Sequence, residues 1–169
     1  MTRAEIYSYT LAMMPNNKES AYLHIPAFTS GIFLHIGTFL SIALFVVFFF
    51  VDPKIFPEWL TWTCVVILLV SAISGLSLLI KRMVSGKLRD LSNVDDFISN
   101  LLTTLFHIVT IFYLIFAYQA AIYYYIEVSL LLLYLPVGKL RHVIYFFAAR
   151  YHLGFFYGWR NTWPPQKMD

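Results

Sequence analysis

The chain has 169 residues, of which 60% are hydrophobic and only 12% are charged, and its mean hydropathy is +0.70. A soluble domain is usually about 45–50% apolar and about 25% charged, so this composition argues against a soluble globule, a disordered chain and a disulfide-stapled secreted fold. The net charge of +3 does not call for nucleic acid, because the basic flanks of membrane spans account for it. We therefore predict an integral membrane protein in contact with lipid.

The N-terminal half carries two candidate membrane spans, residues 27–51 and 59–80. A bilayer core of about 30 Å needs roughly 20 apolar residues as helix, and neither stretch contains a charged residue. The segment between them, 52–58, is polar and holds two prolines, which is typical of a tight turn. Residues 1–26 are predicted to form a cytoplasmic or interfacial segment.

The C-terminal half carries a longer apolar stretch. Residues 97–138 contain one charge, Glu127, and a single straight helix of this length would measure about 63 Å, so the stretch must fold back on itself. We predict one helix near 97–117, with an N-cap and acidic first turn just before it. A second helix near 122–150 begins between residues 119 and 128. Residues 151–169 follow as a cytoplasmic tail.

Charge asymmetry predicts the topology. If both termini are cytoplasmic, eleven basic residues lie inside and one, Lys54, lies outside, which is a strong positive-inside pattern and requires an even number of spans. We therefore expect an all-α, four-helix membrane bundle in a cell's inner (cytoplasmic) membrane. The inner basic residues are Arg3, Lys18, Lys81, Arg82, Lys87, Arg89, Lys139, Arg141, Arg150, Arg160 and Lys167.

Two of the five histidines suggest a cofactor site, because ionisable groups inside spans are costly and often functional. His35 lies about 12 Å into the first span. If the last helix begins near Val128, His142 lies about 21 Å along it, hence about 9 Å from the cytoplasmic face. The two imidazoles then face each other at similar depth, as axial ligands of one haem b do between packed helices. The alternative is that each ring bonds the backbone of a neighbouring helix.

The residues before His142 could serve the same haem. Gly138 lies one turn before it and would let a planar macrocycle approach the backbone. Lys139 and Arg141 could pair with haem propionates, which would offset the cost of their charge at that depth. Both side chains could instead extend to the cytoplasmic headgroups.

Residues 136–142 (Pro-Val-Gly-Lys-Leu-Arg-His) resemble the P-F-x-[KR]-[LI]-x-H segment of the nitrate reductase gamma-subunit family. That family includes cytochrome b subunits of heterodisulfide-reductase-like and sulfite-reductase-associated complexes. Residues 31–37 resemble its S-N-x-F-H-x-G segment, and residues 91–96 its acidic entry to the penultimate span. The resemblance covers roughly 28–142 and implies that His35 and His142 ligate the haem nearest the cytoplasm.

The chain departs from this family where an outer haem would be ligated. Phe45 and Tyr124 stand at the positions that carry histidines in members with two haems, so we expect one haem. His107 matches no ligand of the family and could bind quinone, ligate a second haem or bond helix to helix, the last being favoured. Glu127 could be a proton exit beside a quinol, although the solvated end of a span is the preferred interpretation.

The function expected from these features is a membrane cytochrome b subunit of a respiratory complex. It would pass electrons between the menaquinone or ubiquinone pool and a cytoplasmic iron–sulfur partner. The partner must supply the iron–sulfur cluster because the chain has one cysteine, Cys64. The aromatic and basic tail 151–169 suits docking on that partner, or lying in the headgroups. The alternative is a haem-free structural anchor or a small membrane transport protein.

Overall fold

The computed structural model describes residues 2–14 and 24–165, and every regular element among them is a helix. The chain divides into two compact units. The central unit comprises residues 26–140, and the terminal unit combines residues up to 25 with those from 141 onward. Lys18 and Lys167, which belong to the basic residues expected inside, lie outside the described residues.

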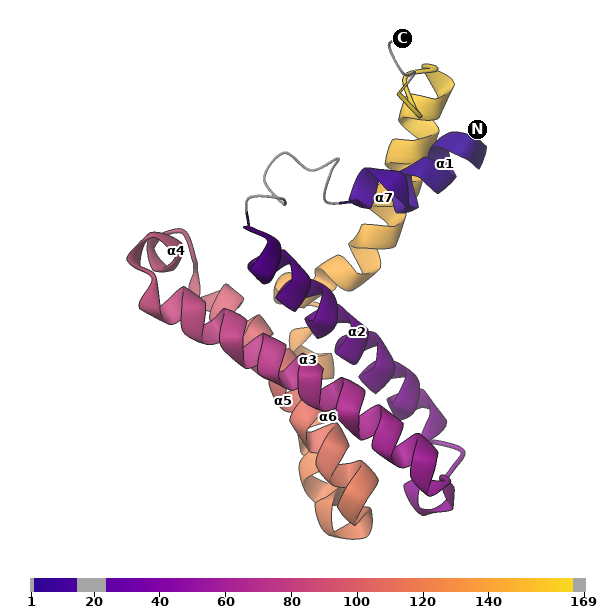
Figure 1. The fold of residues 1–169 in the computed structure, drawn as a ribbon. Coiled ribbons are helices and arrows are strands. Elements are labelled where there is room, and N and C mark those ends of the chain that lie inside the picture. Colours follow the sequence, from indigo (N-terminus) through magenta and orange to yellow (C-terminus); the bar gives the residue numbers. More distant parts are fainter. Residues whose placement is uncertain (1, 15–23, 166–169) are drawn as a thin grey trace. The chain divides into compact units, whose positions relative to one another are not determined.

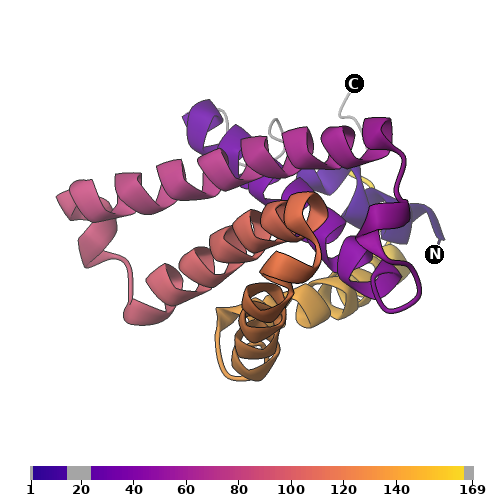
Figure 2. The same ribbon diagram turned by 90° about the horizontal axis from the view of Figure 1, so that it is seen from below.

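The central unit holds the long apolar helices (Figure 1). Helix α5 lies between two partners, because it packs against α3 on one side and α6 on the other, and Figure 2 shows α3 and α5 running alongside each other. Leu68, Phe106 and Tyr124 are among its most deeply buried side chains. Its elements are α2 (Ile25–Val47), η4 (Pro53–Ile55), α3 (Glu58–Val84), α4 (Gly86–Asp90), α5 (Val94–Phe116), α6 (Tyr118–Tyr134) and η5 (Lys139–Arg141).

Three helices, α2, α3 and α5, are long and apolar enough to cross a membrane. A fourth span is present only if α6 and the segment Lys139–Trp159 count together as one interrupted span. The expectation of an all-helical, multi-pass membrane protein is therefore confirmed at the level of three to four apolar helices.

The turns on either side of α5 follow from local chemistry. Asn93 caps α5: its side chain accepts a hydrogen bond from the backbone amide of Asp96, while the Asp96 carboxylate accepts one from the Asn93 amide. This agrees with the N-cap and acidic first turn expected there.

At the other end of α5, Asp52 accepts a hydrogen bond of 2.5 Å from the hydroxyl of Tyr118, the first residue of α6. That bond, together with the Lys54 amide, lowers the pKa of Asp52.

The helix expected over 122–150 is two helices in the structure. α6 starts at Tyr118 and ends at Tyr134, and α7 (His142–Trp159) starts after an irregular segment. Pro136 explains the interruption, because it has no backbone N–H and its ring crowds the preceding turn. Gly138 adds a residue of low helix propensity.

Because of this interruption, the expectation that His35 and His142 lie at similar depth on two facing spans loses its basis. Glu127 is not at the outer end of a helix that begins at 128, since α6 begins nine residues earlier and places Glu127 about 14 Å along it. His142 is not on α6 at all, because it is the first residue of α7. His35 and His142 belong to different units of the chain.

The terminal unit pairs the two ends of the described chain. Helix α1 (Thr2–Tyr9), followed by η1 (Leu11–Met13), lies against α7 (Figure 1). The Ser8 hydroxyl donates to the Arg150 carbonyl at 2.8 Å, and the Tyr9 hydroxyl donates to the Phe147 carbonyl at 2.5 Å. Residues 151–159, expected to belong to a separate tail, are the second half of α7 and carry part of this contact.

We expect Gly154→Leu to detach α1 from α7. A Cβ at residue 154 would lie 2.6 Å from the Cα of Glu5 and 3.2 Å from the Ala4 carbonyl oxygen, and backbone atoms cannot move aside as a flexible side chain can. Faster hydrogen exchange at the amides of α1 would report the detachment. Gly31→Leu is the control, because no atom lies within 4 Å of a Cβ there. Equal exchange in both variants would contradict the expectation.

Candidate functional site

His35 lies on the face of α2 that points away from the packed core of the central unit. Its side chain is exposed within the described structure, whereas Gly37, Ser41 and Leu44 form the buried face of the same helix. Two positions separate His35 from Gly37, which is about 200° around an α-helix, so the two residues point in different directions. His35 is therefore outside the packed core of the central unit.

His142 and Arg141 are exposed at the start of α7. His142 is the first helical residue, so the imidazole lies beside the first turn of α7, where backbone N–H groups have no partner within the helix. Arg141 directly precedes His142. Lys139 and Arg141 were the two expected partners of the propionates, and among the described residues the structure gives an ion pair for Lys139 but none for Arg141.

Gly138 and Lys139 have local partners at the N-terminal end of α5. A Cβ at Gly138 would overlap the Tyr134 ring and lie 2.9 Å from an Asp95 carboxylate oxygen. Lys139 donates from its backbone amide to Asp95 at 2.9 Å, and its ammonium group pairs with Asp96 at 2.8 Å. The Tyr134 ring thus occupies the space beside Gly138 that the haem was expected to take. The charge of Lys139 is balanced by Asp96 within the central unit.

His107 is fully buried among three helices. Its Nε2 atom lies 3.1 Å from the Thr38 hydroxyl oxygen, which lies 2.8 Å from the Leu34 carbonyl oxygen. The Thr38 hydroxyl and the Nε2 atom of His107 are thus within hydrogen-bond distance, and the tautomer of the ring sets which of the two donates. This contact between α5 and α2 agrees with the favoured interpretation of His107 as a bond from helix to helix.

Four buried polar atoms have no hydrogen-bond partner among the described residues: His107 Nδ1, Ser41 Oγ, Tyr124 Oη and Glu127 Oε1. Buried polar groups are nearly always paired, so unpaired ones call for a functional or solvent explanation. Sequence reasoning singled out His107 and Glu127 as ionisable groups. It missed Ser41, and it treated Tyr124 as the replacement of a histidine. Small polar residues that recur on one face of an apolar span could have indicated the buried face that contains Ser41.

Tyr124, which was expected to stand in place of an outer-haem histidine, lies among packed rings. Tyr124 is 0% exposed, and its ring centre lies 4.6 Å from that of Tyr113, 5.8 Å from Phe48 and 6.3 Å from Phe106. We name Phe48, Phe106, Tyr113 and Tyr124 the aromatic cluster. Tyr124 is thus enclosed by other rings of this cluster.

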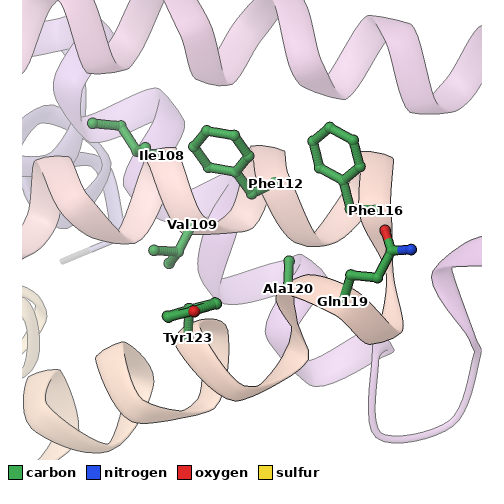
Figure 3. A pocket seen from close by; sticks show the side chains of 7 residues that line it. All are labelled: Ile108, Val109, Phe112, Phe116, Gln119, Ala120 and Tyr123. Atoms are coloured by element: carbon green, nitrogen blue, oxygen red, sulfur yellow. The ribbon is translucent and has the colours of Figure 1, made fainter.

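An apolar groove of about 430 Å³ lies between α5 and α6. Figure 3 shows Phe112 and Phe116 side by side on α5, with Tyr123 on the facing part of α6. Gln119 and Tyr123 contribute the polar groups of its lining; the other members are Ile108, Val109, Phe112, Phe116 and Ala120. This lining suits an alkyl or isoprenoid chain rather than a charged molecule.

Within residues 2–14 and 24–165, no group of three or more histidine, cysteine, aspartate or glutamate side chains is placed to hold a metal ion. A haem with two axial histidines does not need such a group, because the porphyrin supplies the other ligands of the iron. Comparisons with protein-family models, with curated proteins and with solved structures found no match.

Proposed function

We propose that this protein is the membrane cytochrome b subunit of a quinone-linked respiratory complex, with His35 and His142 as axial ligands of one haem b. The observation that carries the proposal is the exposure of both imidazoles outside the packed cores of their units. Both also lie in the segments that resemble the nitrate reductase gamma-subunit family. His107 is enclosed in the core of the central unit.

The donor atoms and the charge of these residues support the choice of this group. Two neutral imidazoles are the donor set of a low-spin b-type haem, and a haem supplies one-electron redox chemistry when bound. Arg141 is the cation next to His142 and is proposed to pair with a propionate. Gly138 and Lys139 were expected to contact the haem as well. In the structure Gly138 contacts the Tyr134 ring and Lys139 pairs with Asp96, and we do not include these two residues in the proposed haem site.

The chain would exchange electrons with a quinone in the membrane and with an iron–sulfur subunit on the cytoplasmic side. The groove of Figure 3 is the feature that favours a quinone, because its apolar walls suit an isoprenoid tail. Cys64 is a single, buried thiol, so an iron–sulfur cluster with several cysteine ligands has to belong to a partner.

An optical spectrum of the full-length chain, purified with its membrane partners, tests the proposal. We expect a reduced-minus-oxidised difference typical of a b-type haem, and reduction by a quinol added to the oxidised sample. A preparation from haem-sufficient cells that contains folded chain and partners but no haem would contradict the proposal and favour a structural anchor.

We expect one haem for each chain. The aromatic cluster fills the region around Tyr124, and Phe45 offers no ligand atom. Quantitation of haem as its pyridine complex, divided by the polypeptide concentration, measures the ratio. A ratio of two would contradict this expectation and would make His107 the first residue to substitute.

A further inference from the structure

Glu127 is an acid buried inside an apolar helix pair. It is 7% exposed and lies on the α6 face that packs against α5, together with Ala120, Tyr124, Val128 and Leu131. Its Oε1 atom has no hydrogen-bond partner among the described residues. An ionised carboxylate is costly to bury without a partner, so a buried acid that can take up a proton is a functional candidate.

A row of hydroxyl groups extends along α5 from its N-terminal end in the direction of Glu127. At that end the Tyr134 hydroxyl donates to the Asp95 carboxylate, and the Ser99 hydroxyl donates to Asp95 at 3.3 Å. One turn further, the buried Thr103 hydroxyl donates to the Ser99 carbonyl at 2.5 Å. We name Asp95, Ser99, Thr103 and Tyr134 the polar seam.

The register of α5 and α6 places Glu127 beyond the seam. The two helices run antiparallel; Tyr134 meets Asp95 near one end, and the Tyr124 ring packs on Phe106 and Tyr113 further along. Glu127 lies between Tyr124 and Tyr134 on α6, so it is level with the part of α5 that follows Thr103. On this register, Thr103 is the residue of the polar seam on α5 that lies nearest the level of Glu127.

The aromatic cluster closes the opposite direction. Tyr124 is one turn from Glu127, and its ring is stacked on Tyr113 and packed edge-on against Phe48. The titratable side chains on α5, the helix packed against α6, are Asp95, Asp96, His107 and Tyr113, and those on α6 itself are Tyr118, Tyr123, Tyr124, Tyr125 and Tyr134.

We propose that Glu127 is a proton-binding site inside the membrane, reached along the polar seam from the Asp95 end of α5 and closed by the aromatic cluster on the other side. The proton adds to the carboxylate from water at the Asp95 end and returns the same way. No redox partner is needed, so the site does not depend on the haem proposal.

Infrared spectroscopy of the full-length chain in detergent micelles tests the site. We expect the C=O band of a protonated carboxylic acid to shift in heavy water, to change position in Glu127→Asp and to be absent in Glu127→Gln. Glu58→Gln, which changes an exposed acid at the start of α3, is the matched control and should keep the band. A band that survives in Glu127→Gln, or a wild-type spectrum without one at every pH at which the protein stays folded, would overturn the proposal.

The access route has its own variant. Tyr134→Phe removes the hydroxyl that meets Asp95, and we expect it to slow the heavy-water shift of the band by about tenfold or more, as loss of a positioned proton carrier does. Tyr123→Phe is the matched control, because Tyr123 is 68% exposed on the same helix. Equal exchange rates in Tyr134→Phe, Tyr123→Phe and the wild type would overturn entry along the polar seam.

Discussion

His142→Ala and His35→Ala are each expected to abolish haem binding. Residues that only hydrogen-bond to a metal ligand already change metal affinity by about 10–100-fold, so loss of an axial ligand itself should leave less than about a tenth of the haem. Both side chains are exposed, so their truncation opens no cavity in a packed core and should leave the helices folded. The measurements are the haem spectrum and the circular dichroism of the same sample.

Matched variants separate ligation from folding. His24 and His152 are also exposed, and His24→Ala and His152→Ala should keep the full spectrum. Free imidazole added to either ligand variant should restore part of the signal, because it can enter the space that the side chain has left. A His142→Ala protein with a full, unshifted b-type spectrum would show that His142 is not a ligand.

Gly37→Val is expected to lower the free energy of unfolding by about 2–3 kcal/mol. Three helices meet at Gly37: an added Cβ would overlap the Ser71 side chain of α3 and lie 3.2 Å from Cε1 of His107 on α5. Both neighbours are buried, so neither can move aside without disturbing the core. The change should also break the contact between His107 and Thr38, which is next to Gly37.

Unfolding by denaturing detergent, followed by circular dichroism, measures the loss. Gly31→Val is the control, because it places the same β-branched residue on the same helix with no atom within 4 Å of its Cβ. The helix-propensity cost is then equal in the two variants, and their difference reports packing alone. Equal stability would mean that α2 does not close on α3 and α5 at this point.

The sequence was sufficient for features that depend on length or on near neighbours. Uncharged stretches of more than 20 residues predicted α2 and α3, because the thickness of the bilayer sets the length of a span. The cap of α5 was predictable because Asn93 and Asp96 satisfy each other's backbone amides within one turn.

Features that depend on which faces meet were not predictable. Hydropathy ran from residue 122 to 150 without a clear stop, and the effect of Pro136 was underestimated. The expected position of Glu127 at the end of a span followed from a separate assumption, a last helix that begins near Val128, whereas α6 begins at Tyr118. Apolar composition also does not indicate which faces of two helices pack together. The docking of α1 on Gly154, and Thr38 as the partner of His107, could therefore not be foreseen.

The link between α5 and α6 bears on how the chain enters the bilayer. A single residue, Ala117, joins the two helices with φ of 45° and is 3% exposed, so α6 is held against α5 as soon as both are made. α6 measures about 26 Å, short of a hydrocarbon core of about 30 Å, and it carries Glu127. Inserted alone, α6 would bring that acid into lipid; inserted as a hairpin, it presents Glu127 to α5. We therefore expect the translocon to release the two helices together, after synthesis has passed Tyr134.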